Sequence, residues 1–161
     1  MKKLTMFLML TIIGGLLLAA CSNDEPKVVE PTLSANEMVN EMLSKIEQPM
    51  MMELTDEQVQ DIYNIDPEKL ADYAIRIPMM NVKSNEIAIL KVKDVADVPA
   101  VEEAVKQRAA TVQQQFETYL PDQYENAKNY KVVTKGNYVL FVISDQADEL
   151  VTEYDRFFNE Q

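Results

Sequence analysis

Hydrophobic residues recur at helical spacing after two capping motifs in the N-terminal half of the chain. Ser34-x-x-Glu37 is a capping box, in which the serine hydroxyl and the glutamate carboxylate each accept a hydrogen bond from a backbone amide at the helix start. Apolar residues follow on one helical face, at Met38, Val39, Met42, Leu43 and Ile46. Pro49 ends this helix. Thr55-x-x-Gln58 is a second capping box and predicts a short second helix.

The C-terminal half contains two further segments with helical spacing. One predicted helix runs from about Asp97 to Tyr119, and the last runs from about Asp145 to Asn159. Between them, Pro121 starts a stretch with no clear period, which predicts a short irregular segment.

Four segments favour β-strands. Residues 73–79 alternate between apolar and other side chains, which is typical of a half-buried strand, and Pro78 places this strand at a sheet edge because proline donates no ladder hydrogen bond. Residues 86–93 form the next predicted strand. Residues 130–135 and 137–144 predict a tight hairpin around Gly136, the residue best suited to a turn with positive φ.

An internal similarity relates the two pairs of strands. Residues 86–97 and 137–148 align without gaps at an offset of 51, and both end in Asp-x-Ala-Asp, where a helix is predicted to begin. The match indicates a structural repeat, or it arises by chance because strands with alternating apolar residues align easily. As a repeat, it predicts two ββα units side by side. The expected fold is α+β: N-terminal helices, then a four-stranded antiparallel sheet with helices on one face.

The N-terminus has the layout of an export signal. Lys2 and Lys3 precede an apolar stretch over residues 4–20, which ends in small residues at Cys21, and the chain becomes polar immediately afterwards. A retained membrane span is the alternative, because about 17 apolar residues is the lower limit for crossing a bilayer. The Leu-Ala-Ala-Cys end resembles the lipobox of bacterial lipoproteins. That resemblance implies lipidation of Cys21 and cleavage before it.

These features divide the chain into three parts. Residues 1–20 are the predicted signal peptide, and residues 21–33, rich in proline and charge, are the predicted lipidated N-terminus and flexible tether. Residues 34–161 are the predicted single domain. Two of the 15 basic residues and none of the 27 acidic ones lie in the signal, which leaves a formal charge of −14. A charge of this sign argues against nucleic acid as a partner.

The inventory of reactive side chains favours a protein without catalysis. The chain has no histidine, its one cysteine is assigned to lipid, and only one glycine follows the signal. Histidine-based nucleophile systems, histidine metal sites and glycine-rich phosphate loops are therefore excluded. We predict no cofactor, no metal site and no catalytic residue. A hydrolase that uses only carboxylates stays open.

Two residue groups are candidates for an interaction surface. Tyr119, Tyr124, Tyr130 and Tyr138 surround the second predicted hairpin, and tyrosine is enriched at interfaces, although packing at the helix ends is the simpler interpretation. The methionines at 50–52 and 79–80 could form an adaptable binding surface, whereas filling of the core or of loops is the simpler interpretation.

Several segments together resemble an uncharacterised lipoprotein family of Gram-positive bacteria, catalogued as a domain of unknown function. They are the lipobox, the segment from Leu54 to Asp66, the strand at 87–92 with its Asp-x-Ala-Asp, and the Lys135-Gly136-Asn137-Tyr138 turn that leads into Ser144 and the second Asp-x-Ala-Asp. The resemblance implies anchoring on the extracytoplasmic face of the cell membrane. It implies no activity, cofactor or catalytic residue.

The sequence therefore predicts a membrane-anchored, extracytoplasmic lipoprotein that binds an envelope protein or a cell-wall component without catalysis. The first alternative is a lipoprotein that binds a small molecule or peptide for a transporter or sensor, which needs a deep apolar pocket between sheet and helices. The second is a carboxylate-dependent hydrolase of wall polymers, which needs two carboxylates about 5–9.5 Å apart in a cleft.

Overall fold

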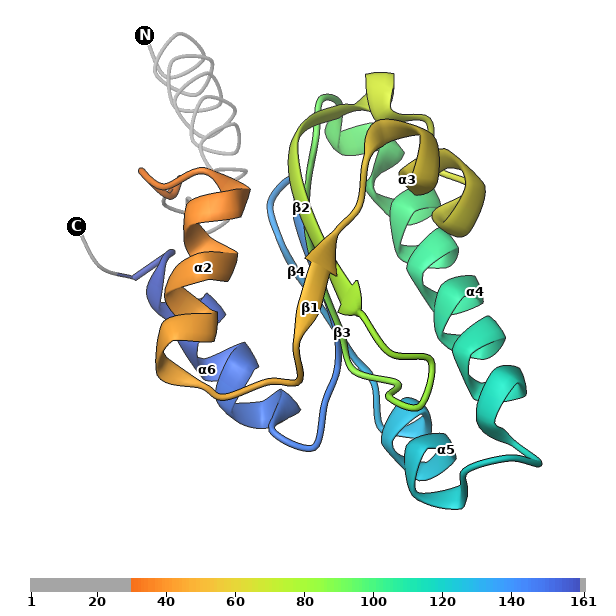
Figure 1. Cartoon of the computed structure of the whole chain (residues 1–161). Helices are drawn as coiled ribbons and strands as arrows, with labels where there is room; N and C mark the ends of the chain where they lie inside the picture. Colours follow the sequence, from red (N-terminus) through yellow and green to blue (C-terminus); the bar gives the residue numbers. More distant parts are fainter. Residues whose placement is uncertain (1–29, 160–161) are drawn as a thin grey trace, which may run out of the picture.

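Five antiparallel strands form the centre of the molecule, in the order β1-β2-β3-β5-β4 (Figure 1). The structure is a computed structural model that describes residues 30–159. The strands are β1 (Met51–Glu53), β2 (Leu70–Pro78), β3 (Glu86–Val92), β4 (Lys131–Lys135) and β5 (Tyr138–Ile143). The α+β class is confirmed, but the sheet has five strands and not the predicted four.

Helices cover both faces of this sheet (Figure 1). One face carries α3 (Asp56–Tyr63), α4 (Val98–Phe116) and α5 (Pro121–Lys128), and we call it the α4 face. The other carries α2 (Ala35–Lys45) and α6 (Ala147–Arg156), and we call it the α2/α6 face. Short 3₁₀ turns at Pro67–Lys69 and Val95–Asp97 precede β2 and α4.

The prediction that helices cover only one face is therefore wrong. In β3, Ile87 and Ile89 pack on the α2/α6 face, whereas Ala88 and Leu90 pack on the α4 face. All six residues of β5 are buried. Near-continuous apolar runs of this kind are typical of strands that are covered on both sides, because successive side chains point to opposite faces.

The prediction of two equivalent ββα units is also wrong, because the helices cover both faces of the sheet. The helix after β3 is α4, and the helix after β5 is α6, so the two units place their helices on opposite faces. The links from strand to helix also differ in the residue whose side chain accepts the hydrogen bond. Asp94 accepts a hydrogen bond from the Ala96 amide (2.9 Å), whereas in the second unit it is the Ser144 hydroxyl that accepts from the Gln146 amide (3.0 Å).

Strand β1 was missed, and the predicted edge position of β2 is wrong at its C-terminal end. β1 pairs with this end of β2, with Met51 opposite Pro78 and Met52 opposite Ile77. Pro78 is tolerated because the β2–β3 register ends at Arg76↔Ile87, before the proline is reached. Its missing amide therefore leaves no ladder bond to β3 unmade.

Helix α5 stands where an irregular stretch was predicted. Pro121 is its first residue, a position at which the missing amide is not needed for the helix and the fixed φ favours helical geometry. Its apolar content is low, so hydrophobic spacing did not indicate a helix.

The locally encoded features agree with the sequence. The Ser34 amide donates to Glu37 Oε2 (2.8 Å), and the Thr55 amide donates to Gln58 Oε1 (3.0 Å), as the capping boxes require. Gly136 has a φ of 59° in the β4–β5 hairpin. These predictions are confirmed because each depends on residues within one turn.

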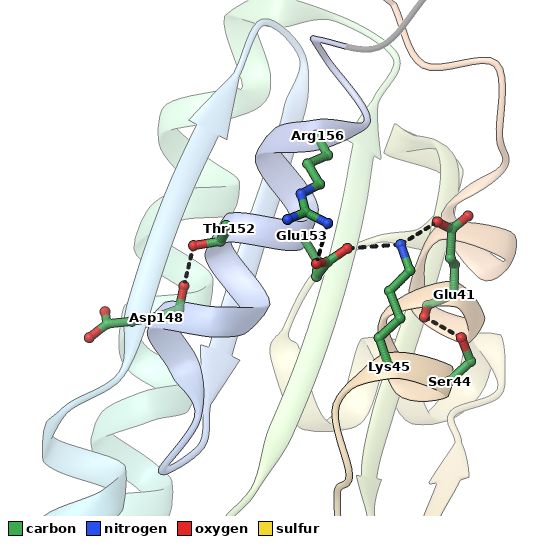
Figure 2. A network of polar contacts seen from close by, with 7 residues as sticks. All are labelled: Glu41, Ser44, Lys45, Asp148, Thr152, Glu153 and Arg156. Atoms are coloured by element: carbon green, nitrogen blue, oxygen red, sulfur yellow. Dashed lines mark hydrogen bonds and ion pairs between the residues drawn. The ribbon is translucent and has the colours of Figure 1, made fainter.

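Helices α2 and α6 lie side by side and are joined by the ion pair between Lys45 and Glu153 (Figure 2). Lys45 Nζ lies 2.8 Å from Glu41 Oε1 and 2.9 Å from Glu153 Oε2, and Arg156 lies 2.8 Å from Glu153. The hydrogen bonds that Lys45 donates to both glutamates raise its pKa. The network connects the first and last described helices across the α2/α6 face.

Candidate functional site

A large cleft lies at the end of the sheet drawn at the bottom of Figure 1. Four segments meet there: the α2–β1 link, the β2–β3 loop, the β5–α6 link and α5. The cleft has a volume of about 600 Å³, and we call it the amide cleft. Its lining is Glu47, Gln48, Pro49, Lys83, Asn85, Asp122, Gln123, Asn126, Asp145 and Gln146.

One glutamine holds three of these segments together. Gln48 Oε1 accepts hydrogen bonds from Asn85 Nδ2 (3.0 Å) and from the Ser144 hydroxyl (3.0 Å). Its Nε2 donates to Gln146 Oε1 (3.2 Å). Asn85 and Ser144 are buried, so their hydrogen bonds need these protein partners. The network fixes the α2–β1 link against the starts of β3 and α6.

A second amide network fixes α5 on the other side of the cleft. Gln123 Oε1 accepts from the backbone amide of Ser84 (2.9 Å), and Asn126 Nδ2 donates to the Ser84 hydroxyl (3.0 Å). Ser84 is buried at the end of the β2–β3 loop. Both walls therefore present amide side chains whose positions are set by buried polar groups.

A second hollow of about 450 Å³ adjoins the amide cleft and shares Asp122, Asn126 and Asp145 with it. Acidic side chains surround both openings and are exposed to solvent; they are Glu47, Asp122, Glu125, Asp145 and Asp148. Lys83 and Lys131 are the cations, and Lys131 is paired with Asp148 (2.9 Å). This rim disfavours anionic ligands and suits neutral or cationic ones.

A separate buried ion pair lies between α4, α3 and β3. Glu86 is 1% exposed. Arg108 donates two hydrogen bonds to its carboxylate, from Nε to Oε1 (2.9 Å) and from Nη2 to Oε2 (2.8 Å). The Tyr63 hydroxyl also donates to Glu86. Burial and the neighbouring Glu86 raise the pKa of Tyr63. The carboxylate is fully engaged, so its geometry is that of a structural pair.

The four candidate tyrosines do not form one surface. Tyr138 is buried on the α2/α6 face against Phe158, whereas Tyr124 and Tyr130 pack against the core of the α4 face. Tyr119 is 63% exposed. Three of these side chains therefore contribute to packing, and the fourth stands alone at the surface.

The sequence did not identify the amide cleft. The buried residues that hold its amide side chains, Ser84, Asn85 and Ser144, directly flank the apolar runs of β3 and β5. Polar residues at the ends of strands that are buried on both faces are a signal that could have pointed to this end of the sheet. The partners Gln48 and Gln146 carry no such signal, because only the fold brings them there.

Cys21 lies outside the described residues, so its lipidation stays a prediction. Within residues 30–159 no helix is long and apolar enough to cross a membrane. The same part of the chain holds no group of three or more His, Cys, Asp or Glu side chains placed to bind a metal. Two residues of the predicted tether, Glu30 and Leu33, contact the domain: Glu30 pairs with Lys91, and Leu33 packs on the α2/α6 core.

Residues 44–144 match the family described as Domain of unknown function (DUF4358). The chain belongs to this family. The DUF4358 match runs from the end of α2 to the residue after β5, so it contains the whole sheet and every lining residue of the amide cleft except Asp145 and Gln146. Neither a curated protein nor a solved structure matches the chain significantly.

Proposed function

We propose that this DUF4358 protein is a membrane-anchored, extracytoplasmic lipoprotein that binds a cell-wall component in the amide cleft without catalysis. The observation that carries the proposal is the set of amide side chains held in place by buried Ser84, Asn85 and Ser144. Amides both donate and accept hydrogen bonds, which suits the hydroxyl and amide groups of glycans and peptides. The acidic rim favours neutral or cationic fragments over anionic polymers.

The position of the cleft is consistent with an anchored protein whose cleft points away from the membrane. Glu30, the first described residue, pairs with Lys91 near the end of β3, whereas Asn85 precedes the start of the same strand inside the cleft. Six residues of extended chain separate these ends by roughly 20 Å. A chain anchored through Cys21 would therefore enter the domain at the end of the sheet opposite the cleft.

The polarity of the cleft supports wall binding over the small-molecule alternative. Pockets for apolar ligands are lined mainly by hydrophobic and aromatic side chains. The lining of the amide cleft contains one hydrophobic residue, Pro49, and no aromatic residue. Its carboxylates lie at the exposed rim, where water stabilises their charge, and not in a buried acid–base pair.

Titration of soluble glycan–peptide wall fragments into the full-length, detergent-solubilised protein tests the proposal. Asn126→Ala and Gln146→Ala remove amides from opposite walls of the cleft, and each is expected to weaken binding about tenfold, the equivalent of one hydrogen bond of about 1.4 kcal/mol. Gln114→Ala is the matched control, because Gln114 is exposed on α4 outside the cleft. Equal affinities for all three variants would refute wall binding at this site.

A crosslinking pull-down from cells distinguishes the envelope-protein alternative. Wild type, Cys21→Ala and the two cleft variants are compared. Recovery of one envelope protein that depends on Asn126 and Gln146, together with no binding of wall fragments, would replace the wall component with a protein partner. Loss of recovery in Cys21→Ala would show that anchoring matters to the interaction.

A further inference from the structure

Four exposed methionines gather at one corner of the sheet. Six large hydrophobic side chains are exposed among residues 30–159, and four of these are Met50, Met52, Met79 and Met80. Their exposed fractions run from 39% for Met52 to 75% for Met50. The two methionines of α2, Met38 and Met42, are fully buried in the core of the α2/α6 face.

The strand register places three of these methionines on the same face of the sheet. Met52 lies opposite Ile77, and Met51 lies opposite Pro78, so Met50 lies opposite Met79, whose amide donates to the Met50 carbonyl (3.0 Å). Side chains alternate along a strand, so Met50 and Met52 share a face, as do Ile77 and Met79. Directly opposite residues have Cβ atoms about 4.5–5.5 Å apart.

That face is the α4 face. Ile77 packs against its core, and Ile77, Met79 and Met80 line a hollow of about 240 Å³ beside α4. Met51, between Met50 and Met52, instead packs on the α2/α6 core. By the strand register, Met50 and Met52 therefore lie on the same face as Met79, which lines this hollow together with Met80.

This composition favours a metal ion over a docked protein. Docking surfaces obtain most of their binding energy from buried tryptophan, tyrosine and arginine anchors. The exposed apolar residues of this corner are all methionines, and sulfur is the one feature that they share. Thioethers are soft ligands that select Cu⁺ over hard divalent cations. The chain's net charge of −12 adds a long-range attraction for a cation.

We propose that Met50, Met52 and Met79, with Met80 at the rim of the hollow, form a thioether site for a soft monovalent metal ion of the Cu⁺ type. Three sulfurs on one face satisfy the low coordination number of such an ion. None of the four methionines lines the amide cleft, so the site is independent of wall binding. Ion binding involves no change of oxidation state in the protein.

Silver(I), a soft monovalent ion that does not change oxidation state in air, is the probe. All proteins carry Cys21→Ser, which removes the only thiol of the chain, and are full length in detergent. The methionine methyl groups are ¹³C-labelled and followed by NMR during the titration. We expect the resonances of Met50, Met52 and Met79 to shift with one equivalent of Ag⁺, while Met38 and Met42 do not respond.

Leucine variants separate sulfur from apolar surface, because leucine preserves the size and hydrophobicity of methionine. Met50→Leu and Met79→Leu are each expected to weaken Ag⁺ binding at least tenfold. Met51→Leu is the matched control, since Met51 belongs to the same strand but faces the opposite core. Equal Ag⁺ affinity in all three variants, absence of the methyl shifts, or equal affinity for Zn²⁺ would overturn the proposal. If Met50→Leu and Met79→Leu leave Ag⁺ affinity unchanged and the protein binds a protein partner at this corner, the corner is a docking surface instead.

Discussion

At the residue scale, Glu86 shows how burial changes the meaning of a charged side chain. As the first residue of an apolar strand, it has the appearance of a polar strand end in the sequence. In the fold it is buried and bound by Arg108 and Tyr63, which come from two different helices. An ion pair of this kind adds little net stability, but removal of one partner leaves an uncompensated charge in the core.

Glu86→Gln should therefore lower the free energy of unfolding by about 3–5 kcal/mol, because Arg108 then keeps its charge without a counterion. Urea denaturation measures the change. Glu103→Gln is the control, since Glu103 is exposed on the same helix as Arg108, and its effect should lie within about 0.5 kcal/mol. Adding Arg108→Met to Glu86→Gln should recover part of the loss. A loss below about 1 kcal/mol in Glu86→Gln would contradict the buried pair.

At the element scale, short-range signals were sufficient wherever an element is stabilised by its own residues. The capping boxes at Ser34 and Thr55 and the turn at Gly136 were predicted correctly because their partners lie within three residues. Strand β1 was missed because three residues carry no readable period, and its β-ladder partner among the described residues is the distant end of β2. Helix α5 was missed because few of its residues are apolar.

The hairpin turn supplies the prediction at this scale. Gly136 has positive φ, which costs a residue with a Cβ about 1–2 kcal/mol. Gly136→Ala should lower the free energy of unfolding by about 1 kcal/mol or more, as measured by urea denaturation. Gly136→Asn should cost less, because asparagine tolerates this conformation, as Asn64 does here with a φ of 54°. Equal losses for the two variants would show that backbone conformation is not the cause.

At the scale of the whole molecule, the sheet is the inner layer of three. Its α4 face and its α2/α6 face each have a core of their own, and β3 and β5 contribute side chains to both. This arrangement buries polar groups as well as apolar ones, including the hydroxyls of Tyr63 and Tyr154. Burial is the largest cause that raises the pKa of each of these tyrosines above the ordinary value of 10.

Stability should therefore fall at alkaline pH. Below about pH 9 both tyrosines are neutral in the folded and unfolded states. Above it the unfolded chain loses these protons while the folded chain keeps them, so the free energy of unfolding decreases as pH rises. Urea unfolding between pH 8 and 11 measures the slope. Tyr63→Phe should flatten it, whatever its effect on stability at pH 8, and Tyr119→Phe, at an exposed position, is the control. An unchanged slope in Tyr63→Phe would contradict the shift.

The sequence alone determined the elements that depend on neighbouring residues: the capped helices, the long helix α4, the β4–β5 hairpin and the α+β class. It also indicated a domain of unknown function, and residues 44–144 match such a domain. Only the tertiary structure decided that helices cover both faces, that β1 completes the sheet, and that Gln48 meets Asn85 and Ser144 in one cleft. The reason is physical: a helix or strand carries its periodicity in its own residues, whereas the face that a helix covers depends on how distant segments share the burial of a common sheet.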